Sequence, residues 1–185
     1  DKDLQQQNIR INDPGNPGKY YICGKGITRF EQFSSRAAEL NSTIRENDAL
    51  RMREMTAMLD KIFARHGVVT NLDERAVIAR IVARHGCKPE AVTLQERHLA
   101  QAFQEVFFEK VPVDRRVSKL TDIFGTEPKA DVDDAVGIQG DIRSFLMKAG
   151  KACFVPETFV NLAQAKELIM ELGGIPCYPV LADGS

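Results

Sequence analysis

The chain has 185 residues and a formal net charge of −1, with 43% hydrophobic and 28% charged residues, a balance typical of a soluble globular protein. Near-zero charge gives no electrostatic basis for tracking nucleic acid or an anionic membrane surface. No apolar run approaches the ~20 residues that span a bilayer, and DKDLQQQNIR has no signal-peptide core. We therefore expect a cytoplasmic protein with no membrane partner and no sequence-specific DNA binding.

The first segment, Asp1–Gly18, is expected to be a loop, because INDPGNPG places two Pro and two Gly close together. The next stretch, KYYICGKGI at Lys19–Ile27, predicts a short strand that ends at its glycines. A long amphipathic helix is then predicted over Thr28–His66, with Thr28 and Glu31 as a capping box. Phe30 and Phe33 begin its apolar spacing.

A near-repeat, KIFARHG and RIVARHG, places His66 and His85 just before Gly67 and Gly86. One interpretation is a pair of metal-ligating histidines. The other is helix capping, because cations offset the negative C-terminal end of a helix and Gly adopts the left-handed cap. We favour capping.

The second half of the chain is predicted to be mainly helical. Leu72–His85 would be capped by Asn71, and Thr93–Lys110 by Thr93 with Glu96 as its box partner. The further expected elements are a helix at Val113–Phe124, a loop or short helix at 131–140, a helix at Asp141–Ala149, an extended stretch at Lys151–Pro156, a helix at Asn161–Gly174 and a strand from Ile175.

The fold class predicted from these elements is mostly α with a few short β-strands. A helix followed by an apolar strand is typical of a βαβ unit, whose strands have parallel neighbours. Because the chain offers few strands, we interpret it as an interior piece of a larger α/β protein. The four cysteines form no CxxC pair, and we expect all four to be reduced thiols.

The order of motifs resembles one family. An Arg-rich helix is followed by a helix ending in HG, then ERHLAQAF, then FVPETFVNLAQAKELIMELGGIPCYPV. Over roughly Ile44 to Leu181 this resembles the helical insertion and flanking βα unit of PHP-domain (polymerase and histidinol phosphatase) proteins, which are metal-dependent phosphoesterases built on a distorted β/α barrel. The resemblance implies barrel segments at 1–27 and 151–185, a helical insertion domain at 28–125, and a connecting loop and short helix at 126–150.

The chain departs from the family at the metal ligands. It lacks the family's N-terminal HxH and C-terminal DxH motifs, and Val180 and Leu181 stand where a metal-binding His follows the strand. Asp183 is the nearest possible ligand. The resemblance therefore implies that this chain alone binds no metal and is inactive. The divalent ions (Zn²⁺, Mn²⁺ or Mg²⁺) and the phosphorylated small molecule or nucleotide would be bound in a complete parent phosphoesterase, to which this chain contributes a lid and scaffold.

The candidate substrate-binding residues are Arg97, His98 and Lys25, and no catalytic residue or metal ligand is assigned. A guanidinium near a helix N-terminus suits a phosphate, which it binds bidentately. The alternative is a surface Arg and a half-buried His paired with Glu96 or Glu105. Lys25 lies between glycines in CGKG, where the backbone can approach an anion closely. A further acidic run, DVDD at 131–134, is interpreted as a solvated loop.

Two functions stay open. The first is a fragment of a metal-dependent phosphoesterase, and the second is a helical protein-interaction module without catalysis. A helix-turn-helix is disfavoured by the net charge and by a long link between its two helices. Exposed strand edges invite pairing between copies, so a homodimer is also expected.

Overall fold

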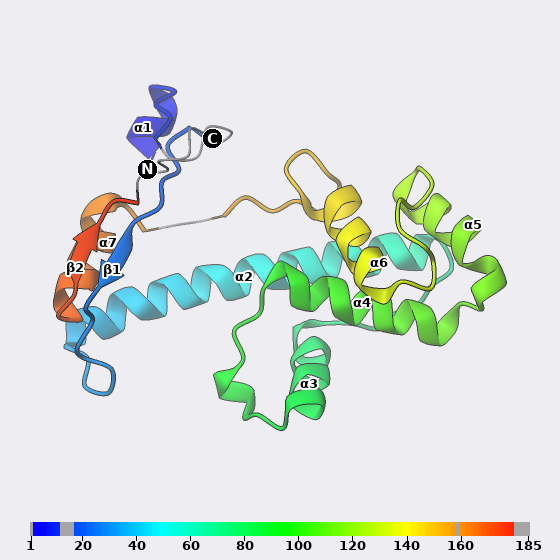
Figure 1. Cartoon of the computed structure of the whole chain (residues 1–185), viewed down its shortest axis with the longest axis horizontal. Helices are drawn as coiled ribbons and strands as arrows, with labels where there is room; N and C mark the ends of the chain where they lie inside the picture. The colour runs from blue at the N-terminus through cyan, green and yellow to red at the C-terminus, as the bar shows by residue number, and fades with distance from the viewer. Residues whose placement is uncertain (1, 12–16, 158–159, 180–185) are drawn as a thin grey trace. The chain divides into compact units, whose positions relative to one another are not determined.

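The computed structural model describes residues 2–11, 17–157 and 160–179. The prediction of a mostly α fold with few short strands is confirmed (Figure 1). In chain order the elements are α1 (Lys2–Gln6), β1 (Cys23–Lys25), α2 (Ser35–Arg65), α3 (Glu74–His85), the 3₁₀ turn η1 (Pro89–Ala91), α4 (Glu96–Lys110), α5 (Val113–Phe124), α6 (Ala135–Ile142), the π-helical turn η2 (Arg143–Met147), α7 (Leu162–Glu171) and β2 (Ile175–Cys177).

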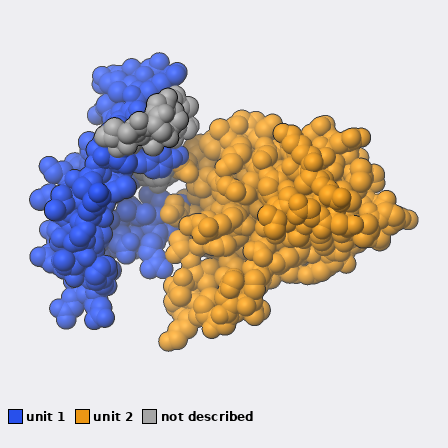
Figure 2. Space-filling model, viewed as in Figure 1, with its two compact units in different colours: residues 1–47, 158–185 blue, residues 48–157 orange. Residues whose placement is uncertain are grey.

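The chain divides into two compact units, coloured in Figure 2. Unit 1 comprises residues 1–47 and 158–185, and unit 2 comprises residues 48–157. The segment 126–150, predicted as a separate connection, packs within unit 2. The four-part division implied by the family resemblance stays a prediction. Among the helices that the structure describes, none has the length and apolar character needed to cross a membrane.

In unit 1, β1 and β2 lie side by side next to α7 (Figure 1). They are antiparallel, with Gly24 opposite Pro176, so the expectation of parallel neighbours is wrong. The physical reason lies before α7, where 151–157 forms turns and irregular chain instead of a strand. Without that strand the helix joins no βαβ unit. Gly24 permits close packing, because a Cβ there would lie 3.1 Å from Cγ2 of Ile169.

The predicted start of the long helix at Thr28 is wrong. Helix α2 begins at Ser35, after Ser34 Oγ accepts the backbone N–H of Ala37 at 3.1 Å. The backbone N–H groups of Thr28 and Arg29 instead donate to the carbonyl of Leu172, both at 3.1 Å. These bonds satisfy the C-terminal end of α7, so tertiary hydrogen bonds replace the helical ones that local spacing suggested. Phe30 and Phe33 are consequently exposed.

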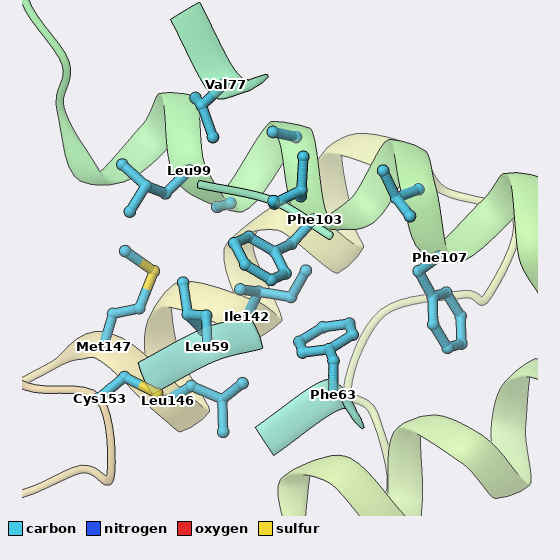
Figure 3. Close-up of a cluster of buried hydrophobic side chains, with 14 of the residues drawn as sticks. Leu59, Phe63, Val77, Leu99, Phe103, Phe107, Ile142, Leu146, Met147 and Cys153 are labelled. Carbon is cyan, nitrogen blue, oxygen red and sulfur yellow. The ribbon is translucent and has the colours of Figure 1, made fainter. Parts of the chain in front are cut away.

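Unit 2 surrounds a core of aromatic and aliphatic side chains from α2, α3, α4, α5, α6 and η2. Helix α4 is central to this core. Its buried side chains recur at helical spacing along most of the helix, from Leu99 to Phe107. Phe63 and Phe103 are fully buried, with ring centroids 5.1 Å apart, and Phe107 meets Phe63 edge-on at 6.3 Å. Figure 3 shows these rings in one cluster with Leu59. Burial of large apolar side chains on this scale is the main stabilising contribution in the unit.

The capping interpretation of the near-repeat is confirmed. Val68 N–H donates to the Phe63 carbonyl at 2.9 Å and Gly67 N–H to the Ala64 carbonyl at 3.0 Å, which is the Schellman pattern. Gly86 closes α3 with a left-handed φ of 63°, and its N–H donates to the carbonyl of Val82.

Two further predicted helix starts move along the chain, from Leu72 to Glu74 and from Thr93 to Glu96. Asn71 has a φ of 54°, and Asp73 caps α3 instead through a 2.7 Å bond from Ala76 N–H. Gln95, not Thr93, precedes α4. In the DVDD run, Asp134 caps α6 by accepting the N–H groups of residues 136 and 137. The helix predicted over Asp141–Ala149 is the end of α6 followed by the π-helical turn η2.

Candidate functional site

The first turn of α4 carries Glu96, Arg97 and His98. Gln95 has an extended backbone and its N–H donates to Nδ1 of His98 at 3.1 Å, while His98 N–H donates to the Gln95 carbonyl at 2.9 Å. The His98 side chain therefore caps the helix as the third residue of a capping box, a position usually taken by Glu or Gln. With Nδ1 accepting, the proton of the neutral ring resides on Nε2, which can donate to an incoming acceptor.

His98 lies among positive charges. Burial, followed by the charges of Arg97, Arg84 and His85, lowers the pKa of His98 below its usual 6.5. Arg84 and His85 end α3, so the end of α3 and the start of α4 form one cationic surface, which we call the α3–α4 surface (Arg84, His85, Arg97 and His98). Arg97 is exposed on it, and His98 is half-buried.

Part of this positive charge is already compensated. Arg84 forms an ion pair with Glu105, and Arg80, one turn earlier, binds Glu109 at 3.0 Å and Glu105 at 3.4 Å. The alternative pairing of His98 with Glu96 or Glu105 is not present in the structure: its Nδ1 is used by the backbone of Gln95, and Glu105 is engaged by the two arginines.

Glu96 accepts bonds from a different set of cations. Its Oε1 lies 2.6 Å from Nη2 of Arg51, and its Oε2 lies 3.3 Å from Nζ of Lys148 and 4.0 Å from Nη2 of Arg143. The Arg51 side chain is only 9% exposed, and its Nε donates to the carbonyl of Val155 at 2.9 Å. We call Glu96, Arg51, Lys148 and Arg143 the Glu96 network.

The ionisation of the network follows from its contacts. Burial raises the pKa of Glu96, but hydrogen bonds and charge attraction from Arg51 and Lys148 outweigh it, and the net pKa is below the usual 4.5. Glu96 is therefore a carboxylate at neutral pH. Asp48 has a raised pKa, because its burial and the charge of Glu157 outweigh the attraction of Arg51. A permanently ionised, paired Glu96 is suited to positioning α4 and not to donating a proton.

Sequence reasoning missed the Glu96 network. One signal was present: Arg51 stands four residues before Met55 and eight before Leu59, both fully buried, so it lies on the apolar face of α2. A charged residue on that face is almost never buried without a partner. The identity of the partner could not be read, since Arg51 and Glu96 are 45 residues apart.

The third predicted residue, Lys25, belongs to unit 1. It is the last residue of β1, is exposed, and lies opposite Ile175 in the ladder. Gly26 follows with a φ of 65° and has no atom within 4 Å of the place a Cβ would take. Arg97 and His98 thus lie together on one surface of unit 2, whereas Lys25 belongs to unit 1.

The residues that the structure describes do not fit the family's metal site. Among residues 2–11, 17–157 and 160–179, no group of three or more His, Cys, Asp or Glu side chains could hold a metal ion. Val180 and Leu181, which the proposed resemblance aligns with the strand-end His of the family, and Asp183, the nearest possible ligand, lie outside the described residues.

The chain was compared with family models, with curated proteins and with solved structures, and no match was found in any of the three.

Proposed function

We propose that the chain binds the phosphate group of a phosphorylated small molecule or nucleotide, as the substrate-pocket segment of a metal-dependent phosphoesterase of PHP type. The motif order supports the family. The single observation that carries phosphate binding is the α3–α4 surface, where an exposed guanidinium and an imidazole Nε2–H stand at the first turn of a 15-residue helix. Guanidinium groups and helix N-termini both favour phosphate oxygens.

In the proposed enzyme, this chain binds the phosphate and other residues bind the metal ions. Phosphoester hydrolysis by divalent ions needs several converging His and carboxylate ligands, and the whole chain has three His. We therefore assign the metal ligands to residues outside this chain. Arg97 and His98 orient the phosphate, and the Glu96 network fixes the turn that carries them.

A direct test uses inorganic phosphate and phenyl phosphate, titrated into the 185-residue chain and followed by the NMR shifts of the backbone amides of residues 95–98. Arg97→Gln should weaken binding at least about tenfold, because a hydrogen bond to a charged group contributes about 1.5–3 kcal/mol. Arg115→Gln, an exposed arginine of α5, is the matched loss of charge and should leave binding unchanged. Equal affinity of the Arg97 and Arg115 variants would refute phosphate binding at this surface.

A second candidate, the helical interaction module, is favoured by a different observation. Unit 1 exposes large apolar side chains that include Tyr21, Phe30, Phe33, Ile175 and Tyr178, and these five range in exposure from 44% for Phe33 to 72% for Phe30. Exposed apolar groups beside short strands can be covered by a second copy of the chain. Sedimentation velocity tests this: a homodimer that Phe30→Asp dissociates supports the interaction module, and a monomer at all concentrations contradicts it.

A further inference from the structure

Two cysteines from opposite ends of the chain meet in the strand ladder of unit 1. Cys23 in β1 lies directly opposite Cys177 in β2. Residues directly opposite in an antiparallel ladder point to the same face, with Cα atoms about 4.5 or about 5.5 Å apart. Disulfides join Cα atoms that are about 4.4–6.8 Å apart. The backbone therefore already holds these two thiols at a spacing that a disulfide can bridge.

The two thiols are also accessible. Cys23 is exposed and Cys177 is partly exposed, and both are reduced in the structure. Cys177 Sγ makes only a weak 3.4 Å contact with the carbonyl of Ile175. Cys153 differs, because it is fully buried in the core of unit 2 and burial raises its pKa to about 11, so it is expected to be unreactive. Cys87 belongs to unit 2 and stands outside the ladder.

We propose that Cys23 and Cys177 form a redox-responsive thiol pair that a small-molecule disulfide oxidises to an intramolecular disulfide. In the first step one thiolate attacks a sulfur of the oxidant RSSR, forming a mixed disulfide and releasing RS⁻. In the second step the opposite thiolate attacks the protein sulfur, which closes the Cys23–Cys177 bond and releases a second RS⁻. The two thiols lose two protons and two electrons, and RSSR is reduced to two thiols.

The location of the pair gives the oxidation a structural consequence. Each strand has three residues, and the ladder has three residue pairs. So short a ladder is marginally stable without support. A bond between its strands would tie the segment that follows α7 to the segment that precedes α2. This inference concerns unit 1 alone and is independent of the proposed phosphate binding.

The test exposes the full chain to mixtures of oxidised and reduced glutathione and maps the products by mass spectrometry without reduction. The expected product is a monomer that has lost two hydrogen atoms, with the peptides of Cys23 and Cys177 linked. Maleimide labelling of the native wild-type protein should then be lost at both cysteines together and retained at Cys87. Cys23→Ser should convert the product to a glutathione adduct on Cys177.

Three results would overturn the proposal. They are separate glutathione adducts on Cys23 and Cys177 with no linked peptide, a link that includes Cys87, and a link whose yield rises with protein concentration because it joins two chains. The maleimide labelling is made on the wild-type protein, so its result remains interpretable even if a serine substitution disturbs the fold.

Discussion

Replacing Glu96 by Gln removes the anion of the Glu96 network while retaining the size of the side chain. Arg51 is 9% exposed and loses its 2.6 Å partner. Removing one partner of a fully buried ion pair costs about 3–5 kcal/mol, because it leaves a buried charge uncompensated. Here the cost is smaller, since the Glu96 side chain is 17% exposed and Arg51 keeps the Val155 carbonyl at 2.9 Å and Glu157 at 4.0 Å.

We therefore expect Glu96→Gln to lower the free energy of unfolding of unit 2 by about 2 kcal/mol, within the range for charged hydrogen bonds. With a urea m-value of about 2 kcal/mol/M, the midpoint should fall by about 1 M. Glu109→Gln is the matched control, because Glu109 pairs with Arg80 at an exposed site. Its cost should be about 0–1 kcal/mol.

The assay is urea denaturation of a double-mutant cycle, with Arg51→Met, Glu96→Gln and both changes together. The double variant should be more stable than the sum of the single effects by at least about 1 kcal/mol, because the apolar Met leaves no buried charge to neutralise. A coupling energy near zero, or an effect of Glu96→Gln equal to that of Glu109→Gln, would refute the reasoning.

Three further outcomes follow from the structure. Phe103→Ala should cost about 3–5 kcal/mol because its ring is fully buried, while Phe30→Ala, at a 72% exposed ring, should stay within about 0.5 kcal/mol; equal denaturation midpoints would contradict this. His98 has a folded pKa below its unfolded 6.5, so the unfolded state binds more protons and the wild type should lose stability as pH falls below 6.5. His98→Gln, which keeps a capping acceptor, should lack this component, and identical pH profiles would contradict it. Gly86→Ala, at a φ of 63°, should cost about 1–2 kcal/mol by thermal denaturation, and an unchanged midpoint would contradict it.

Locally encoded features could be predicted from the sequence. The glycine caps after His66 and His85 depend on residues within one turn, and the structure has both. The start of α2 could not be predicted in this way. Thr28 and Arg29 donate their N–H groups to Leu172, which follows them by more than 140 residues. Local helical spacing at Phe30 and Phe33 gives no information about that competing partner.

In the candidate site too, features that depend on neighbouring residues could be predicted, and contacts between distant residues could not. Arg97 and His98 could be placed near the start of a helix from local spacing, although the predicted cap, Thr93, lies two residues before the observed one, Gln95. The capping role of His98 Nδ1 was missed, since the box pattern usually has Glu or Gln at that position. The contact of Glu96 with Lys148 spans 52 residues of sequence, so only the folded chain reveals it.

We propose that this chain orients the phosphate of a substrate that a metal-dependent phosphoesterase hydrolyses. The most direct measurement is elemental analysis combined with hydrolysis of phenyl phosphate in Mn²⁺ or Zn²⁺, made on the 185-residue chain and on the parent phosphoesterase that we propose contains it. We expect bound metal and hydrolysis in the proposed parent protein, with a raised KM in Arg97→Gln and an unchanged KM in Arg115→Gln. Absence of metal and of hydrolysis in both proteins would contradict this proposal.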